Sequence, residues 1–171
     1  MHGEVWRLIT GPLLHSSILH FLSNTLFLLL IGPLTWYFYS YRTVGVILLA
    51  NTLGALVSTL LGTYTDNTPF DGYAGLSPGI FALYGLVSLS GVLNKRLLPP
   101  GIALHLGFIA IISIVTASVY INHTANWSHW AGLLFGMALA PLLKGKKIEL
   151  SEVTELNLED YFEGMIRGKK N

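Results

Sequence analysis

Long stretches without a charged residue constrain this chain more than any other feature. Asp, Glu, Lys and Arg are absent between Arg7 and Arg42, Arg42 and Asp66, Asp71 and Lys95, and Arg96 and Lys144. A transmembrane helix needs about 20 predominantly apolar residues. The first three gaps accommodate one helix each, and the last accommodates two because the polar stretch 120–128 divides it. The sequence therefore predicts spans at residues 13–35, 43–62, 76–93, 101–120 and 128–143.

The composition supports a membrane protein. Only 11% of the 171 residues are charged, against roughly 25% in an ordinary soluble domain, which argues against a soluble enzyme. Strands of alternating polarity are absent, and lipid requires every backbone group to be paired, so we expect an all-α, polytopic bundle of five transmembrane helices. The chain has no cysteine, which excludes disulfides, thiolate metal sites and cysteine nucleophiles. A net charge of +1 gives no indication of a nucleic-acid partner.

The distribution of cations predicts the orientation. Five spans put Arg42, Lys95, Arg96, Lys144, Lys146 and Lys147 on one side, and only Arg7 on the other. The positive-inside rule then places the N-terminus outside and the C-terminus in the cytoplasm. We expect an integral protein of the cell (plasma) membrane, with a membrane domain at 1–147. The segment 148–171 holds six of the nine acids, and its helical pattern of apolar residues predicts an amphipathic cytoplasmic tail.

Polar residues inside the spans are costly in lipid and are therefore candidates for function. The first span contains His15, His20 and Asn24, and the last two of these are four residues apart, on one helix face. Ser77 lies near the start of the third span and His129 near the start of the last. With the predicted topology, these side chains lie at a similar depth near the outer surface.

This set of residues suits acyl transfer. A serine hydroxyl becomes a good nucleophile when a neighbouring base accepts its proton, and the imidazole of His129 is the candidate base for Ser77. Asn24 and His20 can donate hydrogen bonds to the oxyanion that develops. No Asp or Glu falls within a span, so we expect a Ser/His dyad without an acidic third member.

Small residues predict how the two helices that carry the dyad approach each other. Gly132 and Gly136 form a G-x-x-x-G pattern, which allows helix backbones to come close in lipid. Gly75, Gly79, Ala82 and Gly85 supply small residues along the third span. Pro78 is tolerated because it falls in the first helical turn.

Together these residues resemble the rhomboid family of intramembrane serine proteases. The four motifs that carry the resemblance are Trp6-Arg7, His15 to Asn24 as H-x4-H-x3-N, Gly75-Leu-Ser77, and His129 to Gly136 as H-x-x-G-x-x-x-G. They occur in the family's order and on the expected spans, over about residues 4–143. The chain departs from the family pattern G-x-S-G in having Pro78 after the serine. It also lacks the first span of the family's six-helix core, so we expect either a fragment or a lineage without that span.

The resemblance implies a function and a set of roles. Ser77 would be the nucleophile, His129 the general base, and His20 and Asn24 the oxyanion donors, while His15 would be structural. Phe81 would pack on the catalytic histidine, with Gly75, Gly132 and Gly136 in support, and the loop from Thr63 to Ala74 would cap the site. The expected activity is cleavage of membrane-anchored proteins in or near their transmembrane segment, within the lipid bilayer and without a cofactor.

Three alternatives remain open at the level of sequence. The first is a catalytically inactive rhomboid-like protein that binds transmembrane clients. Pro78 and the missing span are the features that suggest it. The second is a small transporter or channel, which the lack of carboxylates in the spans disfavours. The third is a metal site built from His15, His20 and His129, which no carboxylate or H-E-x-x-H motif accompanies. The oligomeric state is left undetermined.

Overall fold

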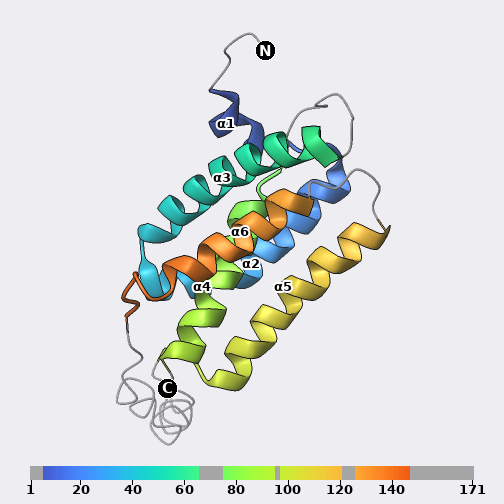
Figure 1. Cartoon of the computed structure of the whole chain (residues 1–171). Helices are drawn as coiled ribbons and strands as arrows, with labels where there is room; N and C mark the ends of the chain where they lie inside the picture. Colours follow the sequence, from blue (N-terminus) through green and yellow to red (C-terminus); the bar gives the residue numbers. More distant parts are fainter. Residues whose placement is uncertain (1–5, 66–74, 95–96, 121–125, 147–171) are drawn as a thin grey trace, which may run out of the picture.

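The computed structural model describes residues 6–65, 75–94, 97–120 and 126–146, and the regular structure in this part of the chain is helical (Figure 1). Two short elements come first, α1 (Arg7–Thr10) and the 3-10 turn η1 (Gly11–Leu13). Five longer helices follow, namely α2 (Ile18–Tyr39), α3 (Arg42–Thr65), α4 (Ser77–Leu93), α5 (Pro100–Tyr120) and α6 (Asn126–Leu139). These five correspond to the five predicted spans, so the predicted helical bundle is confirmed.

Three of the five helices are long and apolar enough to cross a membrane by themselves, at Ile18–Tyr39, Arg42–Leu61 and Pro100–Val119. The helix α4 is apolar but has only 17 residues, and α6 has 14. The short helix α4 lies in the middle of the bundle and packs against α2, α3, α5 and α6 (Figure 1). Most of its residues are buried, whereas α2, α3 and α5 expose many leucine, isoleucine and phenylalanine side chains. This distribution suits a bundle whose outer surface faces lipid rather than water.

Several predicted boundaries were wrong by a few residues. The first long helix begins at Ile18 rather than at residue 13, because Pro12 lies in the turn η1 and Ser17 caps the helix, its Oγ accepting the backbone N–H of His20 at 3.1 Å. His15 therefore precedes α2 instead of lying within it. The last helix ends at Leu139 rather than at residue 143.

The prediction of a loop from Thr63 to Ala74 also needs correction. Helix α3 continues to Thr65, so residues 63–65 are helical. The rest of that predicted loop up to residue 74 lies outside the described residues, as does the predicted tail at 148–171.

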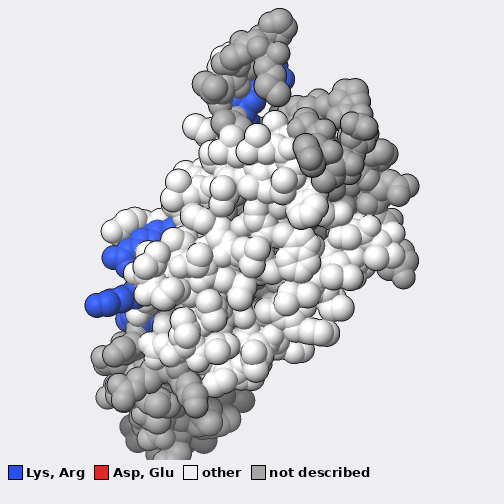
Figure 2. Space-filling view, viewed as in Figure 1, with Lys and Arg blue, Asp and Glu red and all other residues white. Residues whose placement is uncertain are grey.

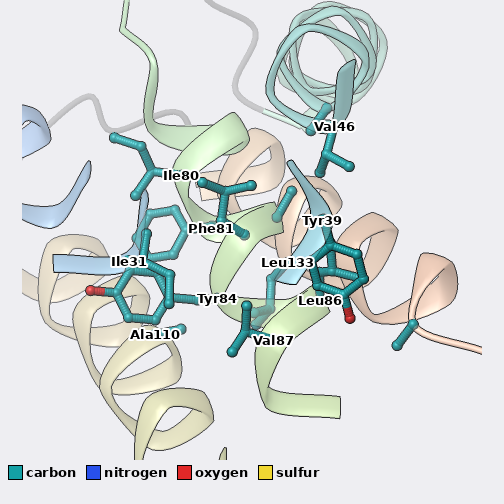
Figure 3. Packing of buried hydrophobic residues seen from close by; sticks show 14 of the residues in the cluster. Ile31, Tyr39, Val46, Ile80, Phe81, Tyr84, Leu86, Val87, Ala110 and Leu133 are labelled. Atoms are coloured by element: carbon teal, nitrogen blue, oxygen red, sulfur yellow. The ribbon is translucent and has the colours of Figure 1, made fainter. Parts of the chain in front are cut away.

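The core forms around α4. Side chains from α4, among them Ile80, Tyr84 and Leu86, meet Ile31 of α2 and Leu133 of α6 in one buried cluster (Figure 3). At the end of α4 farthest from Ser77, the buried hydroxyl of Tyr39 donates a hydrogen bond of 2.6 Å to Ser90 Oγ. Apolar packing along its length and this hydrogen bond to α2 thus hold α4 in place.

Helices α4 and α6 approach each other through glycines, as the G-x-x-x-G pattern predicted. A Cβ added to Gly132 would collide with the carbonyl oxygen of Pro78, and one added to Gly136 would collide with the carbonyl oxygen of Ala82. In the other direction, a Cβ on Gly85 would collide with the carbonyl oxygen of Leu133. The backbones of the two helices are therefore in direct contact over about two turns.

Cations gather where α2 meets α3 and where the chain leaves α6. Arg42 donates to the carbonyl oxygen of Lys144 at 3.4 Å, and the backbone N–H of Lys146 donates to that of Phe38 at 2.8 Å. The Lys146 ammonium lies 5.4 Å from the centroid of the Tyr37 ring. Figure 2 shows one group of Lys and Arg at the left, at this end of the bundle, and a smaller one at the top near α1, with an uncharged surface between them on this face.

Candidate active site

The structure brings together Ser77 and His129, which lie 52 residues apart in the chain and on different helices. Ser77 is the first residue of α4, and His129 lies in the first turn of α6. The distance between Ser77 Oγ and His129 Nε2 is 2.8 Å, a hydrogen bond. Ser77 is only 8% exposed. The pair therefore has the geometry required of a nucleophile and its base.

The aromatic ring of Phe81 contacts the imidazole of His129. Phe81 follows Ser77 by one helical turn, and the two ring centroids are 5.0 Å apart with an angle of 51° between the ring planes. This contact agrees with the expectation that Phe81 packs on the histidine. It restricts the rotation of the imidazole and so helps to keep Nε2 directed toward Ser77.

Two side chains of α2 lie against the segment that leads into Ser77. Gly75 has a φ of +111°, a conformation that glycine adopts without steric cost. A Cβ at this position would come within 2.6 Å of His20 Cε1, 2.8 Å of His20 Nε2 and 3.5 Å of Asn24 Nδ2. Gly75 is therefore required both by its backbone angle and by the close approach of α2. His20 and Asn24 share one helix face, as their spacing predicted.

Asn24 carries a buried donor without a partner. Its Nδ2 makes no hydrogen bond to any described part of the protein. A buried donor left unpaired costs about 1–3 kcal/mol, and such groups call for an explanation. One explanation is that this N–H group is available to donate to an oxyanion that forms during a reaction.

The orientation of His20 has a cause that the sequence interpretation missed. Ser16 Oγ lies 3.1 Å from His20 Nδ1. When the Ser16 hydroxyl donates this bond, the ring proton of a neutral His20 resides on Nε2, the atom that faces Gly75. In that tautomer His20 is a donor on the side of the serine segment. Little in the sequence signals this contact, because Ser16 precedes the cap of α2 and lies outside the helix.

The remaining histidine of the motif, His15, lies beside these groups. Its ring is 5.2 Å from that of His20 and 5.3 Å from that of Phe21, edge to face in both cases. Within the described ranges, no group of three or more His, Cys, Asp or Glu side chains is placed to hold a metal ion.

A second residue that the sequence interpretation missed is Asn51, in the middle of α3. It is buried, and its Oδ1 accepts the backbone N–H of Gly79 at 3.1 Å. The general rule that polar groups in spans are functional candidates would have identified it, but no motif includes it. On the other side of the site, the buried Nδ1 of His129 has no hydrogen-bond partner in the described part of the chain.

The helical bundle and the Ser77–His129 pair define a polytopic membrane protein of the kind that could perform serine-dependent chemistry between helices. Comparison with protein families agrees with this description, because a family model described as the Rhomboid domain matches residues 2–146. The chain belongs to the rhomboid family. Members are generally serine intramembrane proteases, and the family also includes inactive members.

Proposed function

We propose that this protein is an intramembrane serine endopeptidase that cleaves membrane-anchored proteins in or near their transmembrane segment. The hydrogen bond of 2.8 Å between Ser77 Oγ and His129 Nε2 is the observation on which the proposal depends. A serine nucleophile needs a base within hydrogen-bond distance of its hydroxyl, and this contact supplies one.

The two halves of the reaction follow from this geometry. His129 Nε2 accepts the Ser77 proton while Oγ attacks the carbonyl carbon of the scissile peptide bond, which gives a tetrahedral intermediate with a negatively charged oxygen. The imidazolium of His129 then donates its proton to the leaving amine, and the C–N bond breaks to leave an acyl-enzyme on Ser77. A water molecule, deprotonated by His129, hydrolyses this ester and restores the free hydroxyl.

The oxyanion would be stabilised by donors that converge on the start of α4. The N–H of Ser77, the first residue of the helix, has no partner within α4, and His20 Nε2 and Asn24 Nδ2 lie against the preceding Gly75. Donors fixed in place before the reaction stabilise a transition state without a reorganisation cost. We therefore assign His20 and Asn24 to the oxyanion site.

Pro78 motivated the inactive, client-binding alternative, and its position bears on that choice. It lies in the first turn of α4, where a backbone N–H would have no intrahelical acceptor. Proline therefore removes no bond of the helix, and the Ser77–His129 bond forms beside it. The test is labelling of the purified protein by a fluorophosphonate probe, followed by cleavage of a transmembrane substrate in proteoliposomes. A folded protein that neither reacts nor cleaves would favour client binding.

Replacing Asn24 by alanine should lower the cleavage rate by about 10²-fold while substrate binding changes little, because an oxyanion donor acts in the transition state. The measurement is kcat and KM for a transmembrane substrate in proteoliposomes. Thr25→Val is the matched control, since the Thr25 hydroxyl donates to the carbonyl of Phe21 in the same helix at 2.8 Å. An Asn24→Ala rate equal to that of Thr25→Val would remove Asn24 from the oxyanion site.

We also propose that the protein lies in the plasma membrane with its N-terminus outside. The orientation is proposed because Arg42, Lys144 and Lys146 occur at one end of the bundle, and positive residues favour the cytoplasmic side. The chain contains no native cysteine, so single cysteines can report the orientation. On intact cells, a membrane-impermeant maleimide should label Arg7→Cys at once and the exposed Tyr41→Cys only after permeabilisation. The opposite pattern would reverse the proposed topology.

A further inference from the structure

The buried polar contact between α3 and the start of α4 has no role in the mechanism described so far. Asn51 is 2% exposed, and its Oδ1 accepts the N–H of Gly79 across the helix interface at 3.1 Å. Its Nδ2 has no partner in the described residues. The Asn51 side chain is thus bonded through its acceptor oxygen, and its partner is the backbone N–H of Gly79, two positions after Ser77.

Helix α4 lacks any cap from its own sequence. Its N-cap residue is Leu76, and no side chain near the start bonds to the first turn in the way that Ser17 caps α2. Of the early amides, Pro78 has none, and Ile80 already donates to the carbonyl of Leu76 at 3.2 Å. The N–H of Gly79 would remain unpaired in lipid, at a cost of several kcal/mol by the general rule for the bilayer interior. Asn51 supplies the missing cap from a neighbouring helix.

The surface of α3 around Asn51 fits the serine turn closely. Ile47, Asn51 and Gly54 recur at helical spacing on one face of α3. A Cβ added to Gly79 would come within 2.7 Å of Asn51 Nδ2 and 2.9 Å of Ile47 Cγ2. A Cβ added to Gly54 would come within 2.8 Å of Pro78 Cβ. The Pro78-Gly79 step therefore rests directly on α3.

The opposite side of the same step is held by α6. Gly132 contacts the backbone of Pro78, and His129, one turn earlier on α6, bonds Ser77. The first turn of α4 is consequently fixed between two helices. From α6 come the base and a close backbone contact, and from α3 comes the only side-chain hydrogen bond to an amide of this turn among the described residues.

We propose that Asn51 is a positioning residue for Ser77. By accepting the Gly79 N–H, it fixes the rotation of the first turn of α4, and with it the direction of Ser77 Oγ toward His129 Nε2. It also occupies the one other early amide, so that the Ser77 N–H is the backbone donor left for an oxyanion. This inference rests on the proposed serine chemistry, and it assigns a role to a residue that lies outside the family motifs quoted above.

The test is the second-order rate constant for fluorophosphonate labelling of Ser77 in three variants, measured beside their thermal midpoints in mild detergent. Asn51→Leu removes the acceptor at similar volume and should slow labelling at least about tenfold, since small misplacements of reacting groups have effects of this size or larger. Asn51→Asp keeps an acceptor oxygen, whether or not it is ionised, and should label at a rate close to that of the wild type.

Tyr39→Phe is the matched control for a general loss of stability. It removes a different buried hydrogen bond between α4 and a neighbouring helix, the one from Tyr39 to Ser90 near the far end of α4. Its thermal midpoint should fall while its labelling rate stays at the wild-type value. A wild-type labelling rate in folded Asn51→Leu would overturn the inference. An Asn51→Asp labelling rate as low as that of Asn51→Leu would also overturn it, and so would a Tyr39→Phe rate as low as that of Asn51→Leu.

Two further measurements keep the outcome decisive. If Asn51→Leu does not fold, Asn51→Ala removes the same acceptor without adding a branched side chain, and the same comparison applies. Hydrogen exchange of the Gly79 amide in protein labelled with ¹⁵N-glycine reports the bond itself, and exchange should be slow in the wild type and fast without the acceptor. If the wild type does not react with the fluorophosphonate while its Gly79 amide is protected from exchange, the proposed protease would be refuted. If the wild type reacts while its Gly79 amide exchanges freely, the role of Asn51 would be refuted.

Discussion

Replacing Ser77 by alanine is expected to abolish fluorophosphonate labelling and to lower the cleavage rate of a transmembrane substrate by about 10⁴-fold or more. Loss of the nucleophile removes the covalent pathway altogether, and residues of a catalytic unit show effects of this order. His129→Ala should fall to a similar level, because without the base Ser77 stays protonated. The double variant should be no worse than either single one, since the two residues act in one step.

The controls are a second serine and a second histidine of the bundle. Ser90→Ala changes a buried serine at the opposite end of α4, and His105→Ala changes an exposed histidine on α5. Both should label and cleave as the wild type does. Cleavage that persisted in Ser77→Ala would exclude Ser77 as the nucleophile, and persistent labelling in that variant would show that the probe reacts elsewhere.

The second large effect is expected at the contact between α4 and α6. Gly136→Val places a side chain where even a Cβ would collide with the carbonyl oxygen of Ala82. Overpacking of this kind typically costs 1–3 kcal/mol, and here the obstacle is backbone that cannot rotate away, so we expect about 3 kcal/mol or more. Because α6 carries His129, separation of the helices should also break the bond to Ser77 and slow labelling.

The matched control for this substitution is Ala138→Val, two residues further along α6. Ala138 is exposed on the outer face of the helix, so the larger side chain should be accommodated at little cost. The measurement is the thermal midpoint of helical circular dichroism together with the labelling rate of each variant. Equal midpoints for Gly136→Val and Ala138→Val would contradict the close packing of α4 on α6.

The helices could be predicted from charge alone because lipid excludes charge far more strongly than it selects among apolar residues. Their ends could not, because these depend on local bonds. Ser17 caps α2 and so excludes His15 from the helix, and η1 holds Pro12 before that cap. Nor does the charge pattern reveal that α4 is short and enclosed by the other helices, since apolar residues that face lipid and those that face protein look alike in sequence.

The candidate site shows a similar division. Ser77, His129, His20 and Asn24 could be selected because their residue types and spacing match a known chemistry, and the structure places them around one short segment. Asn51 belongs to none of these spacings. Its partner is a backbone amide, which has no signature in the sequence, so the contact becomes visible only when α3 and α4 are seen side by side.

The length of α4 has a consequence for any substrate. Seventeen residues rise about 26 Å at 1.5 Å per residue, whereas the hydrocarbon core of a bilayer is about 30 Å thick. With Leu93 at one interface, Ser77 would stop below the other, within the depth of the hydrocarbon core. A peptide carbonyl that reaches Ser77 must first leave the hydrogen bond of its own helix, at a cost of several kcal/mol in such surroundings. The donors beside Gly75 would then do more than stabilise a transition state, because they would replace the bond that the substrate backbone gives up on entry.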